Sequence, residues 1–165
     1  MAGGDFDDIE QANDIFEAIG NTTIHAGPIG SGLKSKLVNN YMAMVNNAVT
    51  GETLSFANQV GLDIEATAKL MSSTAAGLGQ LNTNYPKKVL ANDLTPDFPI
   101  TMAIKDLNMA LELANSFKSK CFFGELAKKM FEEAEMDGMG HIDQTAILKH
   151  LLGNCLLYTS DAAYY

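Results

Sequence analysis

The chain has 165 residues, of which 47% are hydrophobic and 19% are charged, and these values suit a globular protein of one domain, or of one domain and a fragment of a neighbour. Its 11 Lys and Arg residues against 20 Asp and Glu residues give a net charge of -9. A protein that binds nucleic acid needs a basic surface, so we expect no nucleic-acid partner.

The cysteines and the apolar stretches indicate the compartment in which we expect the protein. Cys121 and Cys155 form neither a metal-binding spacing nor a disulfide framework, so we expect a reduced, cytoplasmic protein without a metal site. The first residues lack the basic segment and apolar run of a secretory signal. The least polar stretch, 37–49, contains four asparagines and is too short to span a bilayer, so we expect no membrane association.

The first segment predicts a helix and then a short strand. Apolar residues recur at three- and four-residue steps over 6–19, Asp5 is suited to cap this helix, and Gly20 is suited to end it. A β-type run follows over 22–25. One helix and one strand cannot form a sheet, so we interpret residues 1–28 as the end of a truncated α/β domain.

A long helix is predicted over residues 31–60, ended by Gly61. Between residues 37 and 49 it has no charged side chain and is apolar on nearly every side. A helix of this kind is buried, either at the centre of a domain or between subunits.

The rest of the chain predicts helices with short connections. Asp63 caps the first of them, Asp143 starts the last and Gly153 ends it. A loop of small residues is expected over 72–79, and further helices over 63–71, 101–117, 122–136 and 143–152. Met102, Ile104, Leu107, Leu111, Ala114 and Phe117 are expected to face inward. We predict a mainly α fold, with a helical domain over 29–153 and a non-native tail over 154–165.

The stretch that carries chemistry opens the long helix and reads Gly30-Ser31-Gly32-Leu33-Lys34-Ser35-Lys36-Leu37-Val38-Asn39-Asn40. Glycines at a helix start let a ligand come close to the backbone. Lys36 and Asn40 stand four residues apart and therefore share one face of the helix, with Asn47 on the same stripe.

Two interpretations of this stretch stay open on its residues alone. The asparagines could pair across a helix–helix contact and fix its register, while Lys36 extends to solvent. Alternatively, a lysine beside an amide at the edge of an apolar helix could act as a general acid. A buried amide without partners costs about 1–3 kcal/mol, so the asparagines need one explanation or the other. His25, with no second ligand near it in sequence, is expected to be structural.

The pattern Gly-x-Gly-x-x-x-Lys-x-x-Asn-Asn resembles the substrate-site motif of the β-hydroxyacid dehydrogenases, the 3-hydroxyisobutyrate dehydrogenase family. Gly30, Gly32, Lys36, Asn39 and Asn40 match it in register.

A second family element, a phenylalanine seven residues before Lys-Asp-Leu, is matched by Phe98 and Lys105-Asp106-Leu107. The resemblance covers about residues 1–152. Within the family, residues 71–79 and 85–90 resemble the sulfolactaldehyde reductase branch, although Ser73 and Tyr85 depart from its pattern.

The resemblance implies a fold and an activity. The fold is the all-helical, 6-phosphogluconate-dehydrogenase-like C-terminal domain around one long buried helix, preceded by a remnant of a Rossmann-type domain. The activity is that of an NAD(P)-dependent oxidoreductase that interconverts a short 3-hydroxy acid, or a hydroxysulfonate, and its semialdehyde. The semialdehyde that the resemblance suggests is 3-sulfolactaldehyde. It also implies a homodimer or homotetramer through the long helix.

The resemblance further assigns roles to residues. Lys36 is the catalytic acid and base, which donates a proton to the carbonyl oxygen as hydride arrives. The residues implied to bind substrate are Gly30, Ser31, Gly32, Asn39 and Asn40, and those implied to contact NAD or NADP are Phe98, Lys105 and Asp106. We therefore expect a buried pair of Lys36 and Asn40, with Lys105 opening onto the same cleft.

The sequence contains no Gly-x-Gly-x-x-Gly fingerprint. We therefore expect NAD or NADP to be bound mainly by an N-terminal domain that is missing here, and the chain to be inactive alone. An alternative from another class is a non-catalytic helical oligomerisation module. A relative of the imine reductases is an alternative among enzymes, but these commonly replace the lysine found at position 36.

Overall fold

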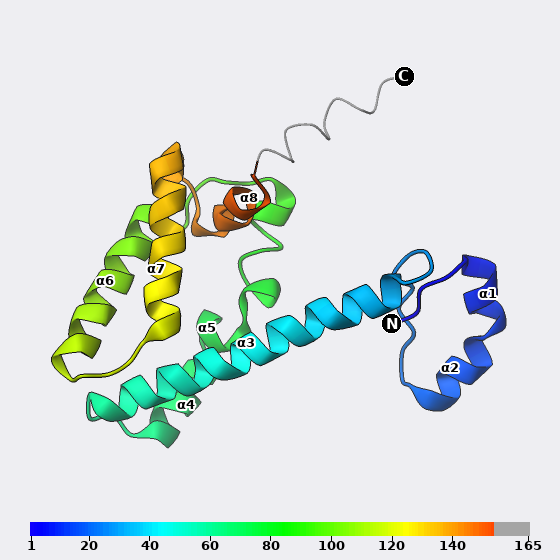
Figure 1. The fold of residues 1–165 in the computed structure, drawn as a ribbon, viewed down its shortest axis with the longest axis horizontal. Helices are drawn as coiled ribbons and strands as arrows, with labels where there is room; N and C mark the ends of the chain where they lie inside the picture. The colour runs from blue at the N-terminus through cyan, green and yellow to red at the C-terminus, as the bar shows by residue number, and fades with distance from the viewer. Residues whose placement is uncertain (154–165) are drawn as a thin grey trace. The chain divides into compact units, whose positions relative to one another are not determined.

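The structure is a computed structural model that describes residues 1–153, so the predicted tail over 154–165 lies outside the described residues. Figure 1 shows a chain built almost wholly of helices, which confirms the mainly α prediction. It divides into two units, Met1–Thr50 and the residues from Gly51 onward, and each is described by itself. The predicted domain boundary between residues 28 and 29 stays a prediction.

The first unit begins with two helices, where the sequence predicted one. Helix α1 (Phe6–Gln11) and helix α2 (Asn13–Ile19) are separated at Ala12, whose ψ of 3° departs from helical geometry. Asp5 lies at the N-cap of α1 as expected, but its side chain makes no capping hydrogen bond.

The predicted strand over 22–25 is reduced to a single parallel bridge between Ala2 and His25. The Ala2 N–H donates to Ile24 O at 2.8 Å, and the Ala26 N–H donates to Ala2 O at 2.8 Å. The segment has strand-like pairing with one neighbour, and one neighbour does not make a sheet.

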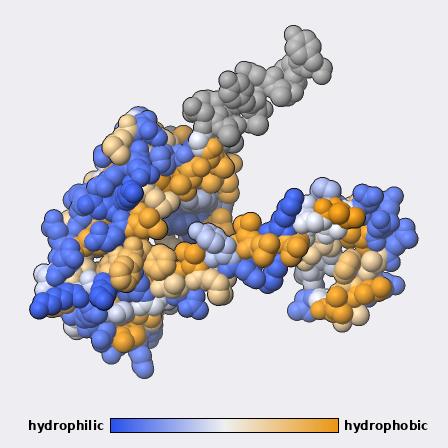
Figure 2. All heavy atoms as spheres, in the orientation of Figure 1, coloured by the Kyte–Doolittle hydropathy of each residue, from blue (hydrophilic) through white to orange (hydrophobic). Residues whose placement is uncertain are grey.

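Helix α3 (Ser31–Gln59) has the predicted bounds, and Gly61 follows it with a φ of +87° that favours glycine. Within the described residues Ala57 is its one buried side chain, so the predicted burial at the centre of a domain is not found, and burial between subunits stays a prediction. Leu33, Leu37 and Tyr41 are 67%, 60% and 73% exposed. Figure 2 shows the resulting apolar surface along α3. A helix that is apolar on nearly every side needs cover on nearly every side, and the described residues do not supply it.

The second unit contains the remaining helices. They are α4 (Ile64–Ser72), α5 (Ala75–Leu78), the 3-10 turns η1 (Gln80–Asn82) and η2 (Val89–Ala91), α6 (Ile100–Ser116), α7 (Phe122–Ala134), the π-type turn η3 (Glu135–Met139), the 3-10 turn η4 (Gln144–Ala146) and α8 (Ile147–Leu152).

Local chemistry accounts for the start of α4 and for the unexpected α5. Asp63 caps α4 as predicted, because its Oδ1 accepts from the Ala66 N–H at 2.7 Å. The stretch predicted as a loop contains α5, which follows α4 closely. A Cβ at Gly77 would clash with the carbonyl of Met71, so only glycine permits this approach.

The core of the second unit lies where α6, α7 and the last turns meet. It consists of buried Ile100, Ile104, Ala134 and Ala146, surrounded by Leu94, Phe131, Met139, Ile142 and Ile147. Gly124 lets α7 approach α6, since a Cβ there would lie 3.2 Å from Leu111 Cδ2. Met102 and Phe117 were expected to face inward but are 37% and 50% exposed. The buried face of α6 includes Ala103 in place of Met102.

Glu52 in the second half of α3 caps α7, which begins about seventy residues later. Both of its carboxylate oxygens lie 3.0 Å from the Phe123 N, and Oε1 lies 3.2 Å from the Gly124 N. The first N–H groups of a helix have no partner within it, so the carboxylate satisfies two of them.

Asp143 is a buried carboxylate, 2% exposed, with both oxygens engaged. Oδ1 accepts from the Thr145 N–H at 3.0 Å and from its hydroxyl at 2.7 Å. Oδ2 accepts from the N–H groups of Asp97 at 3.1 Å and Phe98 at 3.4 Å. Burial alone would raise the pKa of Asp143, but the hydrogen bonds from Thr145, Phe98 and Asp97 lower it below its usual 3.8.

None of the helices described over residues 1–153 has the length and apolar character that crossing a membrane would require.

Asp143→Asn is expected to lower the free energy of unfolding at neutral pH by about 1.5–3 kcal/mol, the range for hydrogen bonds to a charged group. Because the folded-state pKa is depressed, this stabilisation is complete above the unfolded value of 3.8 and is lost as the pH falls through the folded pKa. Urea unfolding of the variant and the wild type should therefore differ clearly at about pH 7, and the difference should shrink only as the pH falls below 3.8. Glu112→Gln, an exposed change on α6, is the control, and an equal difference at both pH values would contradict the prediction.

Candidate functional site

The proposed catalytic lysine lies on the exposed first part of α3. Lys36, Asn39 and Asn40 are all exposed, and within residues 1–153 no hydrogen bond or ion pair joins Lys36 to Asn40. The expected buried pair is thus not formed within the described residues, and burial of Lys36 against another domain or subunit stays a prediction. No other segment among the described residues packs over this part of α3, and its apolar neighbours Leu33 and Leu37 are exposed as well.

Gly30 and Gly32 each have a structural reason to be glycine. Gly30 has a φ of +87°, in the left-handed region, and lies directly before α3. At Gly32 a Cβ would lie 3.0 Å from Met1 O and 3.1 Å from Gly3 N. The two glycines thus allow the turn into α3 and the close approach of the first residues to its start. A contact with substrate stays a prediction.

The second group of predicted residues lies on and before α6. Lys105 and Asp106 are exposed, on the side of α6 opposite the buried Ala103 and Ile104, and no ion pair joins the two within the described part of the chain. Phe98 is half-buried. Its N–H donates to Asp143 at 3.4 Å and its carbonyl accepts from the Gln144 N–H at 2.8 Å, so its backbone is fixed on both sides.

Lys36 belongs to the first unit, and Phe98, Lys105 and Asp106 belong to the second. The cleft that they are expected to share stays a prediction. Sequence reasoning placed Lys36 on the long helix and Lys105 on a later one, as the structure has them, while the burial of Lys36 stays a prediction.

The residues of the second unit fit a contact with a dinucleotide, but not a complete binding site for one. Lys105 offers an exposed ammonium group that no carboxylate of the described residues occupies, which suits an anionic ligand. Phe98 adds an apolar ring held by a fixed backbone. A pyrophosphate group needs a cradle of backbone N–H groups at a glycine-rich turn, and the sequence contains no such fingerprint.

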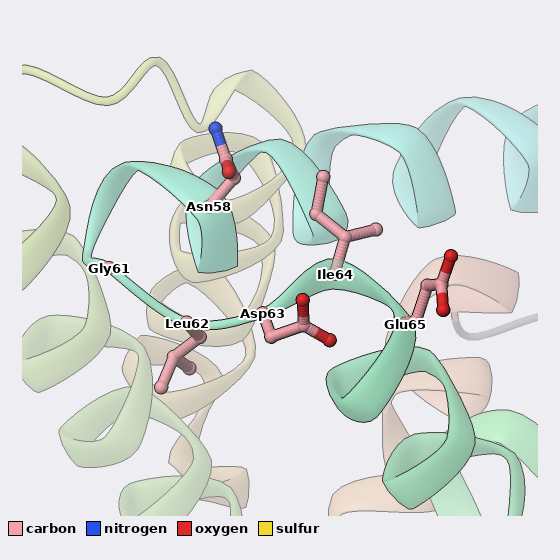
Figure 3. A pocket seen from close by; sticks show the side chains of 6 residues that line it. All are labelled: Asn58, Gly61, Leu62, Asp63, Ile64 and Glu65. Atoms are coloured by element: carbon pink, nitrogen blue, oxygen red, sulfur yellow. The ribbon is translucent and has the colours of Figure 1, made fainter.

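A shallow pocket at the turn between α3 and α4 is not the predicted site (Figure 3). It is lined by Asn58, Gly61, Leu62, Asp63, Ile64 and Glu65. Asp63 is already engaged in capping α4, and none of the residues singled out for catalysis lines the pocket.

His25 has the structural role expected of it. Its Nε2 lies 2.9 Å from Gly4 O and 3.1 Å from Gly27 O. Both of these atoms are acceptors, so Nε2 carries the proton, and the ring joins the first residues to the turn before α3.

Lys88 is a buried charge that sequence reasoning missed. It is 7% exposed, and its Nζ lies 3.0 Å from Asp97 Oδ1, 3.5 Å from Asp93 Oδ2 and 2.9 Å from Thr95 O. The hydrogen bond to Asp97 and the charge of Asp93 raise the pKa of Lys88 against the effect of burial. An aspartate five residues after a lysine is too common a pattern to have revealed this network. For Asp143, the sequence indicated only the start of the last helix.

Comparison with known proteins places the chain among dehydrogenases. A family model described as "NAD-binding of NADP-dependent 3-hydroxyisobutyrate dehydrogenase" matches residues 30–151. The 3-sulfolactaldehyde reductase of Escherichia coli K12 is 38% identical over 151 residues, which are 92% of this chain and 51% of that protein. The NAD-dependent L-serine dehydrogenase of Pseudomonas aeruginosa is 30% identical over 90% of this chain and 52% of that protein. The chain thus spans about half the length of these relatives.

Solved structures share the fold. An imine reductase from Pseudomonas sp. is 12% identical with a TM-score of 0.74, covering 90% of this chain and 52% of that one. The imine reductase of Myxococcus stipitatus in complex with NADP+ is 20% identical with a TM-score of 0.71, covering 92% and 56%. At these identities the likeness concerns the fold alone.

Gly32→Ala and Gly51→Ala form a matched pair of substitutions in α3. A Cβ at Gly32 presses on the backbone of Met1 and Gly3, so we expect a net loss of about 1–2 kcal/mol in the first unit. A Cβ at Gly51 meets nothing within 4 Å, so we expect a gain of about 0.5–1 kcal/mol. Thermal unfolding checks the stabilities, and hydrogen exchange should be faster at the Ala2 and Ala26 amides in the Gly32 variant alone. Equal effects of the two changes would contradict the packing role of Gly32.

Proposed function

Because the chain belongs to the 3-hydroxyisobutyrate dehydrogenase family, we propose that it supplies the helical catalytic half of an NAD(P)-dependent oxidoreductase. The observation that carries this proposal is that one family match, over residues 30–151, includes both Lys36 and Lys105. The reaction is the interconversion of a short 3-hydroxy acid, or hydroxysulfonate, and its semialdehyde.

The substrate proposed for the first test is 3-sulfolactaldehyde. The support for it is the 38% identity with the Escherichia coli 3-sulfolactaldehyde reductase over 92% of this chain. Residues 71–79 and 85–90 carry the sequence resemblance to that branch, while Ser73 and Tyr85 depart from it.

Lys36 is proposed as the acid and base. A nicotinamide cofactor, when bound, would supply or accept the hydride. Lys36 would donate a proton from Nζ to the carbonyl oxygen of the semialdehyde and recover it in the alcohol direction, since an alkoxide forming on that oxygen needs a nearby cation. Asn40, one helical turn further on, would orient Lys36 and the substrate. Lys105 and Phe98 would contact the cofactor.

This chemistry requires that water be excluded around Lys36, because a cation acts more strongly on a developing charge in a dry site. The chain alone leaves Lys36 exposed between the exposed apolar side chains of Leu33 and Leu37. We propose that a dinucleotide-binding domain and a second subunit cover this surface, in a homodimer or homotetramer. Exposed apolar patches of this kind mark surfaces that bind other protein.

The same exposed helix supports a second candidate function, that of a non-catalytic oligomerisation module. Its asparagines would then fix the register of a helix–helix interface. The two functions differ at Lys36, whose substitution would change assembly or nothing in the module and would abolish turnover in the enzyme.

Lys36→Ala is the test of the catalytic proposal. We would join the chain behind the half of the Escherichia coli reductase that it does not match, and call the product the joined enzyme. Loss of a positioned acid should lower kcat by about 10²–10⁴-fold, measured as NADH oxidation with 3-sulfolactaldehyde and with methylmalonate semialdehyde. Lys34→Ala is the control, because Lys34 is also exposed on α3 but lies about 200° around the helix from Lys36. Near-normal turnover of the Lys36 variant would refute the assignment.

The 165-residue chain by itself should not turn over either substrate with NADH or NADPH, because it lacks the cradle for the pyrophosphate. The measurement is the same assay at high chain concentration, with the joined enzyme as the positive control. Turnover by the chain alone would show that the missing fingerprint is not needed.

A further inference from the structure

The segment that leads into α6 is held by a segment about forty residues later in the chain. Four backbone hydrogen bonds of 2.8–3.1 Å join them, from Asp143 N to Leu94 O, Gln144 N to Phe98 O, Ile100 N to Ile142 O and Thr101 N to Gly140 O. Pro99 and Asp143 also form an antiparallel bridge. The entry into α6 is therefore positioned by residues just before α8.

The Asp143 side chain is the centre of this contact. Its Oδ2 receives the N–H groups of Asp97 and Phe98, and its Oδ1 receives the N–H and hydroxyl of Thr145. Since the carboxylate is 2% exposed, water cannot easily replace these donors. One oxygen thus holds the loop before α6, and the other anchors the carboxylate to η4.

The other side of the same loop is held by a buried charge of opposite sign. Lys88 Nζ donates to Thr95 O at 2.9 Å and pairs with Asp97 Oδ1 at 3.0 Å. Two buried charges therefore hold the loop over 93–98. The Lys88 ammonium group binds Thr95 and the Asp97 side chain, and the Asp143 carboxylate binds the backbone of Asp97 and Phe98.

We propose that Asp143 is a positioning residue for the cofactor contact made by Phe98 and Lys105, an inference that rests on the proposed function. Phe98 is bound to Asp143 through its own N–H. Ile100, the first residue of α6, is 0% exposed and in the core, and Lys105 follows it on the same rigid helix. A shift of the loop therefore moves both residues that are proposed to contact the cofactor.

The test compares Asp143→Asn with Thr145→Val in the joined enzyme, at a temperature where both are folded. Asparagine presents an NH2 group where the carboxylate presented an acceptor, so it opposes one pair of N–H donors. Thr145→Val removes the hydroxyl bond to Oδ1 and leaves the bonds to Asp97 and Phe98 in place. We expect Asp143→Asn to raise KM for NADH by about tenfold or more, and Thr145→Val to leave it within about twofold although it also lowers stability.

A second measurement does not depend on activity. In the 165-residue chain, hydrogen exchange at the Asp97 and Phe98 amides should be faster with Asp143→Asn and unchanged with Thr145→Val. Faster exchange together with an unchanged KM would overturn the positioning role, and so would equal increases of KM in both variants, which would reflect stability alone. If the unaltered joined enzyme did not bind NADH, the proposed function itself would fail, and this inference with it.

Discussion

The second unit depends on one buried carboxylate. Asp143 accepts four hydrogen bonds, two from the loop before α6 and two from Thr145, and it does so at 2% exposure. A buried charge is tolerated only where its oxygens are satisfied, and here satisfaction requires that two distant segments lie side by side. Figure 1 shows the outcome, with α6, α7 and α8 gathered around the core that Ile100 enters at the start of α6.

The first part of α3 presents the opposite situation, an apolar helix that its own chain leaves uncovered. Leu33, Leu37 and Tyr41 remain more than half exposed, and Lys36 is exposed among them. The hydrophobic effect favours burial of such a surface. In the proposed enzyme, the contact that covers α3 is also what makes Lys36 a useful proton donor, so assembly and catalysis are coupled through one helix.

The glycines of the Gly30–Gly32 motif illustrate how a structural need and a functional one can fall on the same residues. Gly30 is required by a left-handed φ, and Gly32 by the approach of the first residues of the chain. Neither requirement excludes a ligand at the start of α3. Both place the segment before Lys36 in a defined position relative to His25 and the turn at Gly27, which ring and backbone hydrogen bonds hold together.

The sequence by itself determined the mainly α class, the bounds of α3, α4 and α6, and the family, because these follow from local periodicity, capping residues and two short motifs. It misjudged what depends on packing between distant segments. The short α5 depends on the close approach of Gly77 to Met71, and Met102 and Phe117 point outward because other residues of α6 fill the core. Local patterns specify neither of these contacts. Only the tertiary structure revealed that Glu52 caps α7 and that Asp143 and Lys88 hold the loop before α6, since these partners are matched by geometry and burial rather than by spacing along the chain.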